Sequence, residues 1–588
     1  MSRQQFMNFV DEIFMMDSMT DSSPHEFQNL SLQDADNTIQ ALKLYRNTLV
    51  PIARLPTEIL SIIFYLLSGP SFWALKRTSR HTPITPFFLS HVCHRWREIS
   101  LNLPCLWSHI ILTELLPAGA SQMIALAKMA PLNLEAAVKT WDLEIVTGQI
   151  EAHIHHTRHL SLSASPQDFE RMLGRLISSA PSLERLSIKC SNLTDGPMLV
   201  PDNLFNGIAP KLSCLHLDMC SISWVSPLLW GLRELELFTF PRGGRTSLNV
   251  WFDALSQMHQ LERLSLLNNI PIHDSSTRTP MVPGLAVVLP SLRELDVIAS
   301  VLDCFVVLAH LILPALTRLC INAKNTYDSV TPQLISCVAR NAYGPQDTEA
   351  LQSLYIGILG DGAAAVAWTV PWQDDTYDGS RFSDDLPDGI RLARVAFGIR
   401  DIWLRSRMAE THHELLAALP LNHIVSLTVK DRALHRMPVW RDNASRWNKL
   451  QRVRLFPSAV PSFQKMLKDA PRGDPLLPSL EELVLIDVSL TEQKVYYLYN
   501  MLSKLVELEN RLMTLDLRTC IAHDWAVQFL SGIVVNVLGP TRRELGYSLG
   551  GRPEWNGVLK EERGGDHGSD EISVPLGSWD TEDEDDSD

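Results

Sequence analysis

The chain has 588 residues, 45% of them hydrophobic, so it is long enough for two or three domains or one repeat array, and wholesale disorder is excluded. The formal net charge is −15, and Lys560–Asp588 alone holds 12 acidic residues against two basic ones. The rest of the chain is therefore only weakly acidic, which gives no support to nucleic-acid binding.

The N-terminal stretch carries acidic residues and no secretory core, and we expect no membrane span. The most apolar stretch, Val301–Leu316, contains Asp303, His310 and Pro314, so it predicts a buried helix and strand. Nine scattered cysteines without a CxxC pair indicate a reducing compartment, and we expect a cytoplasmic or nuclear protein.

The first predicted element is a helix over Ser31–Val50, after a loose lead-in. Its apolar residues Ile39, Leu42 and Leu49 recur at helical spacing. We expect this helix to pack beside the helices that follow. The alternative is a short coiled coil that binds a partner.

Pro51–Leu112 predicts two amphipathic helices and a closing turn. In Thr57–Leu67 the apolar residues predict one broad stripe. A second helix is predicted from Pro86 to about Ser100, with Arg95 facing away from its apolar stripe. A unit of this size cannot bury all of its apolar surface, so the next domain or a partner must cover part of it.

Three ordered blocks in this stretch, LPTEIL, HVCHRWREI and LPCLW, resemble an F-box of the large fungal F-box families. The resemblance covers about a tenth of the chain, and Ser68–Phe87 is longer and richer in Ser, Thr and Pro than the compact motif. It implies a three-helix module that docks on the Skp-family adaptor of a cullin–RING ubiquitin ligase. The residues expected to form the docking and core surface are Leu55, Pro56, Ile59, Leu60, Ile63, Val92, Trp96, Ile99 and Trp107, with Trp96 as the energetic anchor.

Beyond Leu112 the motif LxxLxL recurs, first as LERLSI at Leu183 and last as LMTLDL at Leu512. The spacing of about 20 to 31 residues is close to that of leucine-rich repeats, each a strand followed by a helix or turn. The last two apolar residues of each motif alternate along a strand and point inward. The alternative is a set of amphipathic strands in another α/β fold. Cys220, Asn269 and Cys520 match the Asn or Cys of the repeat consensus.

Three insertions interrupt the repeats: Gly196–Pro210, Asn268–Pro290 and Gly360–Asp388. We expect loops there, and a partner-binding role for the aromatic and acidic residues of the third is the lesser alternative.

The predicted organisation is a lead-in over 1–50, an F-box-like domain over 51–112, an irregular leucine-rich-repeat solenoid over 113–541 with a loop at 360–388, and a disordered acidic tail over 542–588. The fold class is thus α followed by α/β.

Catalytic patterns are weak. The histidines of HIHHTRH (153–159) lack the fixed geometry of a zinc site. Gly550 and Pro553 follow the GYSLG around Ser548 and break the helix that a nucleophile elbow needs. GDGAAA at Gly360 is a degenerate dinucleotide motif, and a plain repeat turn is the favoured interpretation.

The sequence therefore predicts a protein that is not an enzyme and holds no cofactor or metal. The expected function is the substrate-recognition subunit of an SCF-type ligase, binding the Skp-family adaptor, through it a cullin, and a client protein. The alternative is an interaction scaffold outside any ligase, in which the F-box caps the end of the solenoid.

Overall fold

The computed structural model divides into two compact units, Met1–Leu160 and Ser161–Asp588. Residues 113–160 thus belong to the same unit as the N-terminal helices. The domain boundaries predicted at residues 50, 112 and 541 stay predictions. The predicted tail and Ser548 lie outside the described residues. The structure describes residues 32–68, 86–113, 117–191, 198–238, 247–267, 270, 286–324, 330–342, 350–359, 362–370, 394–400, 413–430, 443, 446–470, 476–508, 510 and 512–539.

The N-terminal unit begins with helices and continues as strand–helix pairs. Strand β1 pairs in parallel with β2, and Ile110 lies opposite Leu134. Its elements are α2 (Leu32–Leu49), η2 (Pro51–Arg54), α3 (Thr57–Ser68), α5 (Pro86–Ser90), α6 (His94–Leu101), η3 (Pro104–Trp107), β1 (His109–Ile111), α7 (Pro117–Ala127), β2 (Leu132–Ala137), α8 (Leu143–His153) and η4 (Ile154–His156).

The helix predicted from Pro86 to Ser100 is two helices. His91 and Val92 form a turn, and Cys93 is fully extended at φ −160° and ψ 170° before α6 begins. The break changes the direction of the chain, so Phe87 packs on Trp107 while Trp96 packs on Phe64. The sequence-based prediction of one continuous helix did not include this change of direction.

The second unit is a mixed α/β structure built on a large, mostly parallel sheet, and its described strands form no closed barrel. Strand β3 (Thr157–Ala164) runs across the division of the chain. The first half of the unit contains α9 (Pro166–Leu173), β4 (Arg185–Cys190), β5 (Met198–Leu199), η5 (Leu204–Gly207), β6 (Cys214–Asp218), β7 (Cys220–Ser221), η6 (Pro227–Leu229), β8 (Glu234–Phe238), α10 (Leu248–Ser256), β9 (Arg263–Leu267), β10 (Val287–Val288), β11 (Glu294–Ser300), α11 (Val301–His310), β12 (Leu311–Ile312), β13 (Arg318–Lys324) and α12 (Thr331–Ala342).

The second half contains β14 (Ser353–Leu359), β15 (Gly362–Trp368), β16 (Val395–Arg400), β17 (Ser426–Val429), β18 (Arg452–Leu455), η9 (Pro457–Ala459), α16 (Val460–Lys468), β19 (Glu482–Leu485), α17 (Glu492–Glu507), β20 (Thr514–Asp516), α18 (Asp524–Leu530) and β21 (Asn536–Leu538). Strands form at the predicted LxxLxL motifs. The apolar stretch at Val301 is the buried α11 followed by β12, as predicted.

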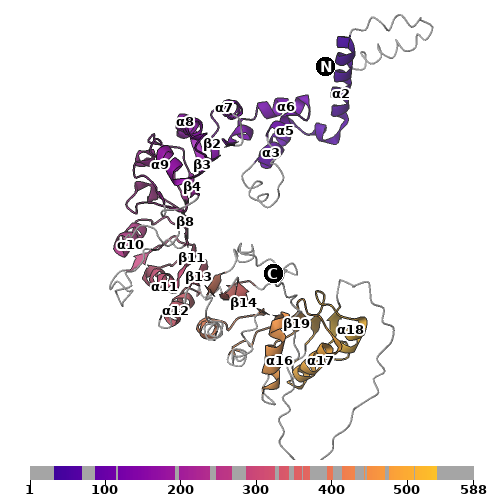
Figure 1. Ribbon diagram of the computed structural model, residues 1–588. Helices are drawn as coiled ribbons and strands as arrows, with labels where there is room; N and C mark the ends of the chain where they lie inside the picture. The colour runs from indigo at the N-terminus through magenta and orange to yellow at the C-terminus, as the bar shows by residue number, and fades with distance from the viewer. Residues whose placement is uncertain are drawn as a thin grey trace, which may run out of the picture. The chain divides into compact units, whose positions relative to one another are not determined.

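The leucines of successive motifs are in register across the sheet. Strands β4, β6, β8, β9, β11 and β13 are parallel neighbours, and the second leucine of each motif lies opposite that of the next. These fully buried residues are Leu186, Leu215, Leu235, Leu264, Leu295 and Leu319. Helices α10, α11 and α12 lie on one side of these strands (Figure 1). The other side carries the polar residues that alternate with the leucines.

One segment breaks the regular order. Strand β13 pairs with β16 and not with β14, and β15 runs antiparallel between β16 and β14. The parallel order resumes where β14 pairs with β17. The expected loop at Gly360–Asp388 is therefore wrong for Gly362–Trp368, and the helix required by a dinucleotide motif is a strand here. Residues 371–388 lie outside the described part.

The insertion predicted at Gly196–Pro210 is also not a plain loop. Its described residues form β5 and η5, and Leu204 and Phe205 are fully buried. Phe205 and Asn206 adopt left-handed backbone angles, at φ 53° and 51°, which turns Phe205 into the core. Of the insertion at Asn268–Pro290, only residues 270 and 286–290 are described, and they include β10. Asn269 lies outside.

Candidate partner-docking surface

The N-terminal helices enclose a small filled core. Leu60 and Phe64 of α3 are fully buried, together with Leu89 of α5, Ile99 of α6 and Leu106 of η3. The Phe64 and Trp96 rings lie 4.8 Å apart at a tilt of 57°. The core is therefore closed by side chains from all four segments, and each burial contributes about 1.5–3 kcal/mol.

Trp107 ties the closing turn to the helices. Its ring is buried and meets Phe87 edge-on at 5.3 Å. Its indole Nε1–H donates to the Ser100 carbonyl at 2.7 Å, at the end of α6. The Pro-Cys-Leu-Trp turn is thus bonded to the last turn of α6, where the Ser100 carbonyl also accepts from the Leu103 backbone N–H.

Arg95 fixes the backbone that enters α3. Its guanidinium donates to the carbonyl oxygens of Ala53 and Leu55, the latter at 2.7 Å. Sequence reasoning placed Arg95 away from the apolar stripe of its helix and did not predict these backbone partners. A fork of several N–H donors can bind two carbonyls at once, which explains why arginine occupies this position.

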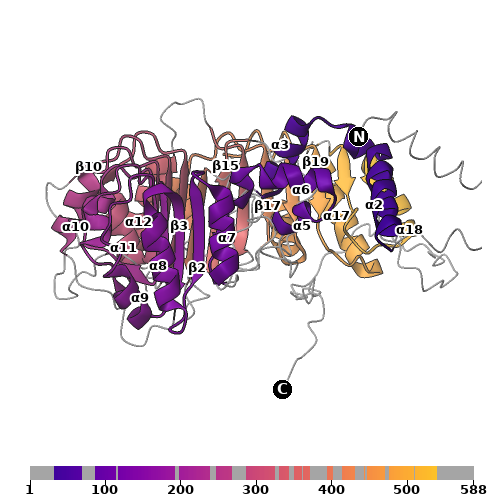
Figure 2. The ribbon, with the colours of Figure 1, turned by 90° about the horizontal axis from the view of Figure 1, so that it is seen from above.

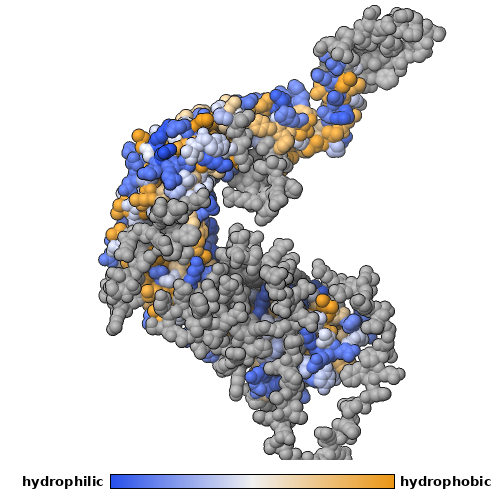
Figure 3. Space-filling view, in the orientation of Figure 1, coloured by the Kyte–Doolittle hydropathy of each residue, from blue (hydrophilic) through white to orange (hydrophobic). Residues whose placement is uncertain are grey.

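A second set of apolar residues on the same helices faces away from the core. Ile62, Tyr65 and Leu66 of α3 are 55, 52 and 65% exposed, and Phe88 and Val92 are 60 and 57% exposed. Figure 3 shows hydrophobic residues on the surface of these helices. Exposed large apolar residues gathered on one small unit indicate a candidate binding surface. We call Ile59, Ile62, Tyr65, Leu66, Phe88 and Val92 the outer apolar set.

The predicted site residues divide between this set and the core. Leu60, Ile99 and Trp107 are buried, and Leu55, Ile63 and Trp96 are half-buried. Pro56, Ile59 and Val92 are exposed. Trp96 packs on Phe64, so its ring belongs partly to the core, and its role as a docking anchor stays a prediction.

Sequence reasoning missed Ile62, Tyr65, Leu66 and Phe88 as outward residues. The signal was present, because α3 reads TEILSIIFYLLS and is apolar almost all round. A helix apolar on every side must be covered on every side. The core of this small unit covers only one side of α3.

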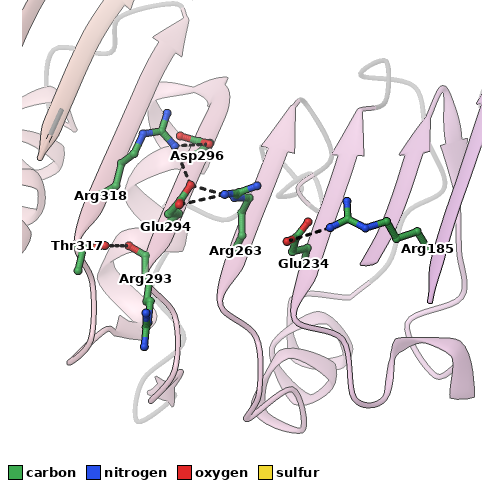
Figure 4. Close-up of polar contacts among 8 residues, drawn as sticks. All are labelled: Arg185, Glu234, Arg263, Arg293, Glu294, Asp296, Thr317 and Arg318. Atoms are coloured by element: carbon green, nitrogen blue, oxygen red, sulfur yellow. Dashed lines mark hydrogen bonds and ion pairs between the residues drawn. The ribbon is translucent and has the colours of Figure 1, made fainter. Parts of the chain in front are cut away.

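A second candidate surface is the polar face of the sheet, where charges alternate from strand to strand (Figure 4). Arg263 of β9 makes two hydrogen bonds with Glu294 of β11, at 2.9 and 3.1 Å. Arg318 of β13 reaches both Glu294, at 3.4 Å, and Asp296, at 2.9 Å. Arg185 lies 3.8 Å from Glu234. The charges in this row neutralise one another.

Asp296 is the least solvated carboxylate of this row. Burial raises its pKa, although the nearby Arg318 guanidinium acts in the opposite direction. Its Oδ1, the Nε of Arg318 and the Oδ1 of Asn322 are buried without a partner among the described residues.

The histidines and cysteines of the described residues are the remaining candidates for metal binding or catalysis. His153 ends α8, and His155 and His156 lie in the short η4 that follows it. Within the described residues no group of three His, Cys, Asp or Glu side chains could hold a metal ion. Burial raises the pKa of the Cys214, Cys320 and Cys520 thiols to about 12, so these thiols are poor nucleophiles.

Two comparisons with known proteins give no relative. No protein-family model matches the chain, and no curated protein matches its sequence. In the part of the chain that the structure describes, no helix combines the length and the apolar character needed to cross a membrane.

Proposed function

We propose that this protein is the substrate-recognition subunit of an SCF-type cullin–RING ubiquitin ligase. On this proposal α3, α5–α6 and η3 form an F-box that docks on the Skp-family adaptor, and through it on a cullin. The strand–helix units form an irregular leucine-rich-repeat solenoid that binds a client protein. The resemblance of LPTEIL, HVCHRWREI and LPCLW to an F-box supports the first part, and the aligned LxxLxL strands support the second.

The observation that carries the proposal is the outer apolar set beside a filled core. Leu60 and Phe64 already complete the interior, yet Ile62, Tyr65 and Leu66 on the same helix remain exposed. Exposed apolar surface costs roughly 25 cal/mol per Å² relative to burial. A protein partner that covers this face recovers that free energy, which fits an adaptor-docking module.

The proposed mechanism involves no chemistry by this chain. Binding of a client to the repeats raises its effective concentration near the ubiquitin-charged enzyme of the ligase. The polar sheet face, with its row of ion pairs between neighbouring strands, is the candidate client surface. The proposed location is the cytoplasm or the nucleus, where such ligases act.

The test is co-purification with the adaptor. The double substitution Ile62→Asp and Leu66→Asp places two charges in the outer apolar set and should weaken adaptor binding by about 100-fold or more. Ile145→Asp is the matched control, because Ile145 is a comparably exposed apolar residue on α8 of the same unit. Undiminished binding by the double variant would show that the docking assignment is wrong.

The alanine variant of Leu55 and Pro56 supplies an independent check. It should abolish adaptor co-purification while the repeats stay folded. Leu55 is half-buried and its carbonyl accepts from Arg95, so circular dichroism must show that the helices survive.

The scaffold alternative has one observation in its favour. Within the N-terminal unit, η3 packs against α7 and β1, the first strand–helix pair. The helices thereby cover the end of a repeat, as a cap would. Near-stoichiometric recovery of adaptor and cullin from cells supports the ligase proposal, and their absence supports the scaffold.

A further inference from the structure

Among the residues that the structure describes, nothing covers an apolar seam on helix α2. Ile39, Leu42 and Leu49 are 47, 50 and 58% exposed, and the main contact of α2 is with the short η2 that follows it. Figures 1 and 2 both show α2 apart from α3, α5 and α6. The expectation that this helix packs beside the following helices is therefore wrong.

The exposed residues follow a coiled-coil repeat. With Ile39 at position a and Leu42 at position d, the a and d positions of the helix are Leu32, Ala35, Ile39, Leu42, Arg46 and Leu49. Five of the six are apolar, and Arg46 is the exception. The adjacent e positions hold an acidic residue, Asp36, and a basic one, Lys43, both exposed.

We propose that α2 pairs with α2 of a second copy of this chain, in antiparallel orientation. In such a two-fold pair, opposite residues have numbers with a constant sum. Centring the pair between residues 40 and 41 places Ile39 of each copy against Leu42 of the other.

Charge complementarity supports both the partner and the orientation. In the antiparallel pair Asp36 of each copy lies near Lys43 of the other, so two opposite-charge pairs flank the central apolar layers. A parallel pair would bring the two Arg46 side chains together at one layer, and Asp36 would not meet Lys43. Like charges in one layer oppose pairing.

The association should be modest. An 18-residue helix is about 27 Å long and supplies only about two and a half heptads. We therefore expect a dissociation constant on the order of micromolar for the full chain. The pairing is independent of the outer apolar set, so it does not rest on the proposed adaptor.

Sedimentation of the full-length protein over a concentration series is the first experiment. The unaltered chain should form a dimer, and Ile39→Asp should raise the dissociation constant by at least about 100-fold because both copies carry the change. Leu44→Asp is the matched control, since Leu44 is as exposed as Leu42 but lies outside the seam. This control should leave the dimer intact.

Charge reversal tests the orientation. Asp36→Lys and Lys43→Asp should each weaken the dimer about tenfold, because each creates two like-charge pairs, and the double variant should restore it. A monomeric unaltered chain overturns the proposal. So does failure of the double variant to restore pairing, which contradicts antiparallel pairing.

One competing occupant of the seam is the chain's own N-terminal segment, in which Phe6, Phe9, Val10 and Ile13 recur at helical spacing. Removing residues 1–31 should leave the dimer unchanged. If the truncated chain instead dimerises where the unaltered chain does not, the segment covers the seam and the proposal is wrong. The Ile39→Asp variant should still co-purify with the adaptor, because the seam on α2 is separate from the outer apolar set. Failure of the dimer proposal can therefore be distinguished from failure of the proposed function.

Discussion

Single side chains bridge long stretches of sequence in the N-terminal unit, and Arg95 is the clearest case. Its bonds to Ala53 and Leu55 join residues about forty positions apart and set the angle at which the chain enters α3. Without them, the carbonyl oxygens of Ala53 and Leu55, just before α3, would depend on water. The polar face of α6 is therefore part of the structural framework.

Replacing Arg95 by alanine should destabilise the helical module by about 1.5–3 kcal/mol, the usual value for a hydrogen bond to a charged group. Hydrogen exchange of residues 51–57 should accelerate in proportion. Arg95→Lys is the control, since an ammonium cannot reproduce the fork and should restore only part of the protection. Unchanged exchange in the alanine variant would mean that the clamp contributes nothing.

The sequence did not predict the role of Arg95, because helical spacing places it opposite the apolar stripe. Its partners are backbone carbonyls some forty residues earlier. Because every residue has a carbonyl, the sequence does not indicate which ones accept a hydrogen bond. The buried Leu60, Ile99 and Trp107 were predictable, since each lies on the apolar stripe or in the closing turn.

At the scale of elements, the LxxLxL motif carries most of the information. It predicted the strands that carry a copy of the motif and which of their residues point inward, and Leu235, Leu264 and Leu295 lie opposite one another as successive copies should. It did not predict that β16 pairs with β13. LARVAF is a weak copy, and the alanine-rich β15 lacks the alternation that marks a strand.

Truncating Leu264 to alanine should cost about 2–5 kcal/mol, because its side chain is fully buried between Leu235 and Leu295. The expected result is faster hydrogen exchange in β8, β9 and β11. Ser265→Ala, on the same strand but the opposite face, is the control and should change stability by less than about 0.5 kcal/mol. Equal effects of the two substitutions would contradict the assignment of faces.

At the scale of the whole chain, the two units should respond differently to pH. Burial lowers the pKa of His109, His153 and His156, all in the N-terminal unit, although Glu135 partly opposes this effect at His109. A lowered pKa means that the folded state prefers neutral histidine. The unfolded chain therefore takes up these protons first as pH falls below about 6.5.

The N-terminal unit should accordingly be most stable above pH 6.5 and lose stability as the solution is acidified toward pH 5. Its hydrogen-exchange protection, measured across this range, should fall more than that of the second unit. His109→Gln should reduce the dependence on pH. A dependence that is unchanged in this variant would show that His109 does not contribute.

The inserted strands β14–β16 have a consequence for synthesis of the chain. Strand β13 is synthesised before its partner β16, and their paired residues Leu319 and Val395 are 76 positions apart. At a translation rate of about 5–20 residues per second, β13 keeps an unpaired edge for roughly 4–15 seconds after it is made. Strands β4 to β13 need no such delay, because each next strand follows within one repeat. Until β16 is made, this edge of β13 needs protection against pairing with other chains.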